Sequence, residues 1–153
     1  MKNNVNRKPA GFTLVEIMIV VAIIALLAAI AVPNFLRARK RAQATRILED
    51  LRLIDAAVDL YAIDNNKSTG DAANWSDVKA YLKTGSMLYS SGGMNILGGW
   101  YGGNPASPAS NVGVFAVDGG PNVCLDPVTF DQLKDVAPAD FWSPYIPVSW
   151  LGL

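Results

Sequence analysis

One acidic side chain stands at the start of the longest apolar stretch of this sequence. Glu16 directly precedes twenty residues, Ile17 to Leu36, that carry no charge. A carboxylate beside or within hydrocarbon is costly, so it serves a purpose or finds a partner of opposite charge. Cleavage between Gly11 and Phe12 would create an α-ammonium group four residues before Glu16. If the chain were cut there, this spacing would allow Glu16 to form an ion pair with the new ammonium group.

The amino-acid composition gives little support to an enzymatic function. The chain has 153 residues and no histidine, and so lacks the commonest catalytic base and metal ligand. Its single cysteine, Cys124, cannot form an internal disulfide and best fits a buried apolar position. The 13 basic and 13 acidic side chains balance, which gives no indication of a nucleic-acid partner. We expect a protein that is not an enzyme.

The N-terminal residues resemble those of a known family, the type IV pilins and the pseudopilins of type II secretion systems. Precursors in that family have a short basic leader that ends in Gly, then Phe-Thr-Leu-x-Glu and a long apolar helix. The matching residues here are Lys2, Arg7, Lys8, Gly11, Phe12, Thr13, Leu14 and Glu16. The resemblance covers the first third of the chain well and the remainder weakly. Removal of the leader would leave 10 basic and 13 acidic side chains, a net charge of −3.

The resemblance implies roles for four positions. Prepilin peptidase would cut between Gly11 and Phe12 and methylate the amino group of Phe12, and Glu16 would pair with that group on a neighbouring subunit. Pro33 lies where the family commonly has a proline, which fits helices that loosen as they pack into a filament. From the residues alone, Pro33 predicts a kink or local melting. Glu16 is also consistent with simple stabilisation by the dipole of the first helical turn.

An ordinary secretory signal is the alternative interpretation of this stretch. Basic residues, an apolar run and then Ala29-Ile30-Ala31 would allow cleavage after Ala31. Glu16 argues against this interpretation, because such signals are apolar at that place.

A single helix is predicted from Phe12 to about Asp64. Its apolar part is long enough to cross a bilayer, because twenty helical residues rise about 30 Å. A stripe at spacings of three and four then predicts an amphipathic continuation. The stripe consists of Ala44, Ile47, Leu51, Ile54, Val58 and Tyr61. Charged pairs such as Arg46 and Asp50 are expected on the other sides of this helix.

Four basic residues follow the apolar run: Arg37, Arg39, Lys40 and Arg41. They outnumber the basic residues of the leader, so the positive-inside rule would place the downstream domain in the cytoplasm. The family resemblance implies the opposite, an inner-membrane protein with one span and a periplasmic C-terminal domain, and we give it more weight. We expect the basic cluster to face solvent or lipid headgroups.

The predicted fold class is α+β. A long N-terminal helix, half transmembrane and half amphipathic, is expected to pack on a pilin-like domain with short helices and a small antiparallel sheet. Turn and capping residues predict helices over Trp75–Lys83 and Asp126–Asp135, and strands over Val112–Val117 and Asn122–Leu125. The expected division is a leader (1–11), a membrane helix (12–36), its amphipathic continuation (37–65) and a globular domain (66–153).

No cofactor is expected, and calcium is the one metal that the resemblance raises. Pseudopilins of type II secretion bind calcium in a late loop, for which Asp118 and Asp126 are the nearby candidates. The chain has no dense run of acidic ligands such as an EF-hand loop provides. Residues 95–101 echo a motif of those pseudopilins loosely, and the lone cysteine departs from the cysteine pair of many pilins.

These features predict a structural subunit of a type IV pilus-like filament. A pseudopilin of type II secretion is favoured over a surface pilin for adhesion, motility or DNA uptake. The implied partners are prepilin peptidase, identical or related subunits, and an inner-membrane assembly platform whose ATPase supplies the energy. A membrane-anchored binding module that never polymerises is the alternative of another class, and it predicts that Glu16→Leu leaves function intact.

Overall fold

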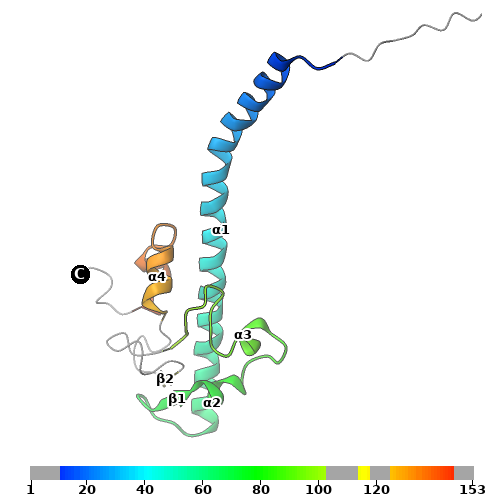
Figure 1. Ribbon diagram of the computed structural model, residues 1–153. Helices are drawn as coiled ribbons and strands as arrows, with labels where there is room; N and C mark the ends of the chain where they lie inside the picture. The colour runs from blue at the N-terminus through cyan, green and yellow to red at the C-terminus, as the bar shows by residue number, and fades with distance from the viewer. Residues whose placement is uncertain (1–10, 103–113, 118–124, 147–153) are drawn as a thin grey trace, which may run out of the picture. The chain divides into compact units, whose positions relative to one another are not determined.

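The computed structural model describes residues 11–102, 114–117 and 125–146. The chain divides into two compact units, residues 1–38 and residues 39–153. One long helix, α1 (Leu14–Asp64), begins in the first unit and ends in the second (Figure 1). The fold is α+β, as predicted, because short helices and one small antiparallel sheet accompany this helix in the second unit.

The limits of α1 lie close to the predicted ones. Thr13 starts the helix, because its Oγ1 accepts a hydrogen bond from the backbone N–H of Glu16 at 3.2 Å. The helix continues through Pro33, so the predicted local melting does not occur. At the C-terminal end Asn66 adopts a positive φ of 49°, a conformation typical of residues that follow a helix.

The core of the second unit is built on the predicted stripe of α1. Five of its six members are buried and Tyr61 is half-buried. Apolar side chains from later in the chain complete this core, and the largest fully buried ones are Tyr101, Phe115, Leu125, Leu133 and Trp142. The outer half of α1 is therefore held by packing against residues far away in the sequence.

The sheet has two strands. β1 (Ala72–Asn74) pairs antiparallel with β2 (Val114–Ala116), so that Ala73 lies opposite Phe115. β2 falls inside the predicted strand Val112–Val117, whereas β1 was not predicted. Most of the predicted strand Asn122–Leu125 lies outside the described residues, and Leu125 itself forms an isolated bridge with Tyr101.

Short helices precede and follow the strands along the chain. α2 (Trp75–Lys79) begins where predicted but is shorter, and the backbone N–H of Asn74 donates to Asp77 at 3.1 Å at its start. α3 (Met87–Ser90) was not predicted, and the Oγ of Ser86 accepts from the N–H of Tyr89 to cap it. α4 (Pro127–Leu133) and a 3₁₀ turn (Ala139–Trp142) follow, and α4 confirms the predicted late helix. Figure 1 shows α3 and α4 on opposite sides of α1 in that view.

Candidate functional site

The predicted processing site is accessible in the first unit. Nothing lies within 4 Å of the position that a Cβ on Gly11 would occupy. The side chain of Phe12 is 78% exposed. Both residues precede the first turn of α1, so the peptide bond between them lies outside the helix.

Glu16 lies in that first turn, where its backbone N–H donates to the Oγ1 of Thr13. Its side chain is exposed, and no basic side chain among residues 11–102, 114–117 and 125–146 pairs with it. The carboxylate is therefore available to a cation that the described chain does not supply.

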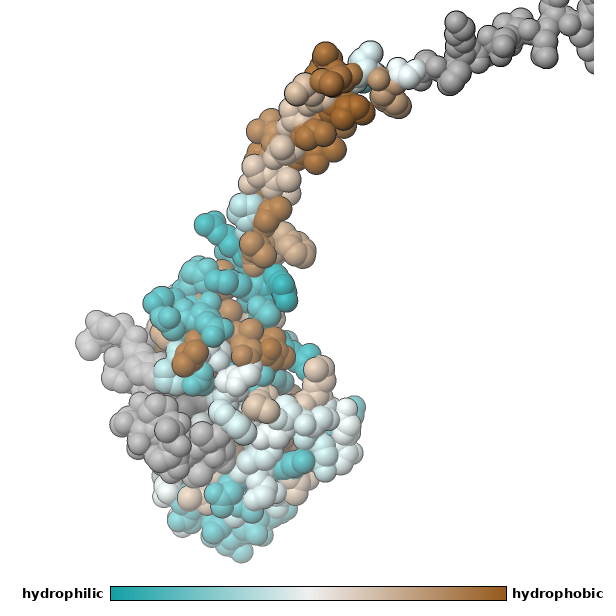
Figure 2. Space-filling model, in the orientation of Figure 1, coloured by the Kyte–Doolittle hydropathy of each residue, from teal (hydrophilic) through white to brown (hydrophobic). Residues whose placement is uncertain are grey.

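The apolar part of α1 is not covered by any described residue of the first unit. Every residue from Ile17 to Leu36 is exposed, and Leu26, for example, is 67% exposed. Figure 2 shows these hydrophobic residues in brown along the first part of the helix. By length and composition this is one helix that could cross a membrane. Either lipid or other protein must cover so much apolar surface.

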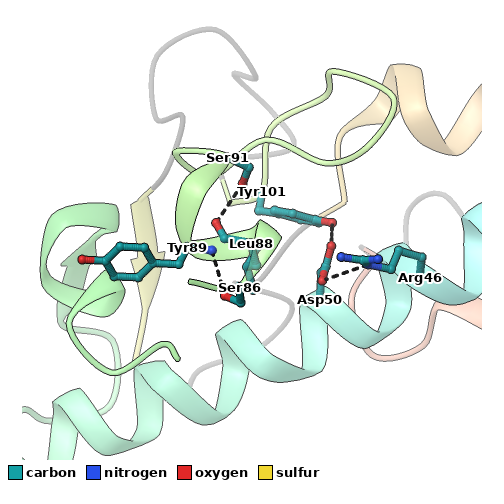
Figure 3. Close-up of polar contacts among 7 residues, drawn as sticks. All are labelled: Arg46, Asp50, Ser86, Leu88, Tyr89, Ser91 and Tyr101. Carbon is teal, nitrogen blue, oxygen red and sulfur yellow. Dashed lines mark hydrogen bonds and ion pairs between the residues drawn. The ribbon is translucent and has the colours of Figure 1, made fainter. Parts of the chain in front are cut away.

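A second polar arrangement lies inside the second unit, where α1 meets the loop after α3. Asp50 is buried, with 6% exposure, although its spacing from Arg46 predicted a place on the charged side of the helix. The hydroxyl of Tyr101 donates to its Oδ2 at 2.9 Å, and the Nε of Arg46 lies 3.8 Å from its Oδ1. Figure 3 shows both side chains directed at this carboxylate. Asp50 was misplaced because Tyr101, its partner, is 51 residues away in the sequence.

Burial decides the electrostatics of this pair. It raises the pKa of Asp50 above its ordinary value, although the hydrogen bond from Tyr101 and the charge of Arg46 oppose the shift. Burial and the neighbouring carboxylate also raise the pKa of Tyr101, so this hydroxyl stays protonated and remains a donor. The pair ties the loop to α1.

Asp126, one of the two candidates for a calcium ligand, has a structural role. Its Oδ2 caps α4 by accepting from the N–H of Thr129 at 3.0 Å and from the hydroxyl of Thr129 at 3.2 Å. The described residues contain no group of three His, Cys, Asp or Glu side chains that could hold a metal. Asp126 is therefore engaged in the cap of α4, and Asp118 lies outside the described residues.

The cap of α4 is continuous with the loop that precedes Tyr101. The Nδ2 of Asn95 donates to the hydroxyl of Thr129 at 3.0 Å, and its Oδ1 accepts from the N–H groups of Leu97 and Gly99. At Gly99 an added Cβ would lie only 2.3 Å from the Oγ1 of Thr129. Residues 95–101, which echo the pseudopilin motif, thus form a tight loop locked to α4 by side-chain hydrogen bonds.

The basic cluster after the apolar run is divided. Arg39 and Arg41 are exposed, as predicted. Lys40 instead bonds to both carboxylate oxygens of Asp135, at 3.1 and 3.0 Å. The pair is half-exposed, so it contributes little to stability but reduces the free positive charge of the cluster.

Comparison with known proteins bears on the N-terminal residues. The family model described as the prokaryotic N-terminal methylation motif matches residues 6–32. The matched stretch is similar to that N-terminal methylation motif. It contains Gly11, Phe12 and Glu16, and its limits include most of the exposed apolar part of α1.

Relatives of two kinds share this motif and the helix that follows. The type IV wide pilus major component PilA4 of Thermus thermophilus is 48% identical over 67 residues, 44% of this chain and 51% of the relative. The type II secretion system core protein G of Pseudomonas aeruginosa is 44% identical over 59 residues, 39% and 42% of the two chains. The core protein G of Aeromonas hydrophila is 36% identical over 61 residues, 40% and 43%.

The chain spans about half the length of the curated relatives it matches. No solved structure gives a significant match to it. The N-terminal similarity therefore says what kind of helix the chain has, and the globular unit must be understood from its own residues. In the first unit, sequence reasoning missed the helix cap at Thr13, although the spacing Thr-x-x-Glu is a known signal for it.

Proposed function

We propose that the protein is a structural subunit of a type IV pilus-like filament, of the kind formed by type II secretion pseudopilins. Prepilin peptidase cuts between Gly11 and Phe12 and methylates Phe12. The subunit then resides in the inner membrane by its single apolar helix, with the globular unit in the periplasm. An assembly platform driven by an ATPase packs it, helix on helix, against identical or related subunits.

The observation that carries this proposal is the unpartnered first part of α1, headed by an accessible Gly11–Phe12 bond and an unpaired Glu16. Lipid satisfies the apolar residues, but it offers Glu16 no specific cation. The methylated amino group of Phe12 on a neighbouring subunit is such a cation. Because an unpaired charge buried in a filament is costly, arrangements in which Glu16 lacks this partner would be disfavoured. Pro33 would ease adjustment of the helix during packing.

A surface pilin is the second candidate, since the Thermus thermophilus relative is named as a pilus component. The likeness to core protein G supports the secretion role equally within the matched residues. Both candidates share processing, membrane insertion and assembly through α1. We favour the pseudopilin because the chain has one cysteine, without the pair that closes a loop in many pilins.

The intact mass of the protein extracted from its native membrane or filament tests the processing step. The expected chain starts at Phe12 and carries one additional methyl group. A chain that starts at Val32 would mean an ordinary exported domain, and the filament proposal would fall.

The variant Glu16→Leu tests assembly separately. We expect it to be inserted and to remain in the membrane, but to form no filaments, because the side chain that pairs with Phe12 is gone. Glu16→Asp, which keeps the charge, is the matched control and should retain part of the assembly. Normal filaments from Glu16→Leu would overturn the pairing on which this proposal rests. A membrane-anchored module that never polymerises instead predicts no filaments from wild type and intact function from Glu16→Leu.

A further inference from the structure

The outer half of α1 carries a second stripe that the described residues of the second unit leave uncovered. Its members recur at spacings of three and four, which places them along one side of the helix. They are Ala42, Thr45, Glu49, Leu53, Ala56, Leu60 and Ile63, and all are exposed. The exposed fractions of Leu53, Leu60 and Ile63 are 55%, 51% and 74%.

An apolar outer stripe of this kind is unusual for a helix on the solvent-exposed surface of a monomeric protein. The outer half of α1 already buries one face against its own unit, so the opposite face is expected to be polar. Single exposed apolar residues are ordinary, but Leu53, Ala56, Leu60 and Ile63 are in line over three helical turns. Such a row indicates a surface that another helix covers.

We propose that the outer stripe is the contact surface for a second copy of this chain, parallel to α1 and displaced along it by about 20 residues, roughly 30 Å. This inference rests on the proposed function for the existence of an assembly. It adds which surface outside the membrane makes the contact, and in which register.

The membrane and the charges of α1 set the direction and the displacement. Copies anchored in one membrane by the same segment run in the same direction, so antiparallel packing is excluded. Without displacement, Glu49 of one copy would face Glu49 of the next, and the arginines would also meet each other, which is repulsive. Exposed bases cluster early in the outer half of α1, at Arg39 and Arg41, with one more at Arg52. Exposed acids lie late, at Asp59 and Asp64.

A displacement of about 20 residues brings opposite charges together. Asp59 of one copy then lies beside Arg39 of the next, and neither forms an ion pair with a described residue of its own chain. Leu60 and Ile63 lie on either side of Ala42, whose small side chain allows the helices to approach closely. Each copy contacts one neighbour through the C-terminal end of its stripe and another neighbour through the N-terminal end. The contact is therefore heterologous and repeats into an open filament.

Cross-linking of the full-length protein in cells that carry its assembly system tests the register. In a Cys124→Ser background, a chain with both Ala42→Cys and Ile63→Cys should give a ladder of oligomers with a short bis-maleimide. Either cysteine alone should give almost no product. Dimers from Ile63→Cys alone would mean unshifted packing and would overturn the inference.

Charge reversal tests the ion pair in the same double-cysteine chain. Asp59→Arg or Arg39→Asp alone should lower the ladder roughly fivefold, and the two together should restore it, because an exposed pair makes a small but specific contribution. No effect of the single reversals, or no rescue by the double reversal, would contradict the assigned register.

Assembly of surface variants separates this inference from the proposed function. Leu60→Glu and Ile63→Glu should be processed and inserted normally but should reduce filaments at least tenfold. Val128→Glu, at a position 62% exposed on α4, is the matched control and should assemble normally. Normal filaments from Leu60→Glu together with loss from Glu16→Leu would overturn the inference and leave the proposed function standing. Wild-type protein that forms neither filaments nor a ladder would overturn both.

Discussion

Asp50 is the residue that most clearly separates what is local in this chain from what is not. A carboxylate four residues after an arginine usually belongs to the solvated side of a helix. Here the same residue is nearly inaccessible, because the hydroxyl of Tyr101 satisfies one of its oxygens and Arg46 approaches the other. Burial of a charged group with a single good hydrogen bond stabilises one arrangement of loop and helix at a cost in total stability.

The stability cost of Asp50 depends on pH. Its pKa is raised in the folded protein, so the group favours folding while it is protonated, and this contribution is lost as pH rises from the ordinary value of 3.8 through the raised folded pKa. Asp50→Asn keeps an acceptor for Tyr101 but cannot ionise. We expect the melting temperature of Asp50→Asn, in detergent, to match that of wild type near pH 4 and to exceed it by a few degrees at pH 8.

The control for this measurement is Asp59→Asn, which changes an exposed carboxylate on the same helix. It should shift the melting temperature little at either pH. Parallel curves for wild type and Asp50→Asn across the whole range would show that ionisation of Asp50 does not oppose folding.

At the scale of elements, α4 and the loop of residues 95–101 stabilise each other. Asp126 and Pro127 predicted the start of α4 correctly, since an acceptor at the N-cap and a proline at the first helical position are local signals. The loop gave no such signal, because its conformation depends on Asn95 reaching Thr129, 34 residues later. The buried amide bonds two backbone N–H groups of the loop and one hydroxyl of α4, and so ties the loop to that helix.

Gly99→Ala tests that lock. The added methyl group would meet the side chains of Thr129, Asn95 and Asp126 at 2.3 to 2.8 Å, so one of these partners must move. We expect the full-length protein to lose about 1–3 kcal/mol of stability, measured by thermal or denaturant unfolding in detergent.

Gly98→Ala is the neighbouring control. It has open space around the new methyl group but a φ of +84°, which an alanine adopts at a cost of about 1 kcal/mol. If Gly98→Ala destabilised the protein more than Gly99→Ala, the close contacts at Gly99 would not be the source of the effect.

At the scale of the whole molecule, the sequence was informative where structure is local. The helix Leu14–Asp64, its buried stripe and α4 follow from periodicity and capping residues, and all are present. β1 could not be predicted, because Ala72–Asn74 has no strand pattern of its own and pairs with a segment about forty residues later. The processing site could be predicted from Gly11, Phe12 and Glu16. The outer stripe could be recognised only once the exposure of each residue of α1 was known.

Membrane anchoring can be tested on the whole protein. Wild type should remain in the membrane pellet after washing with alkaline carbonate, because every side chain from Ile17 to Val32 is apolar. Ile23→Arg places a charge near the centre of the span, at a cost of roughly 2.5–3.5 kcal/mol, and should release a substantial fraction. Ile23→Leu should behave as wild type, and equal retention of Ile23→Arg would contradict a span centred on that residue.

The uniform apolar character of this segment has a consequence for the proposed filament subunit. Between Ile17 and Val32 the helix presents hydrocarbon to its surroundings in every direction. A bilayer can therefore fix how deep this cylinder sits, but not its azimuth, because rotation about the long axis leaves the solvation unchanged. The rotation of the helix about its long axis must therefore be fixed by Glu16 at one end and by the polar half at the other. Each incoming subunit would be able to rotate in the lipid until these two ends make their contacts. This rotation does not disturb the bilayer.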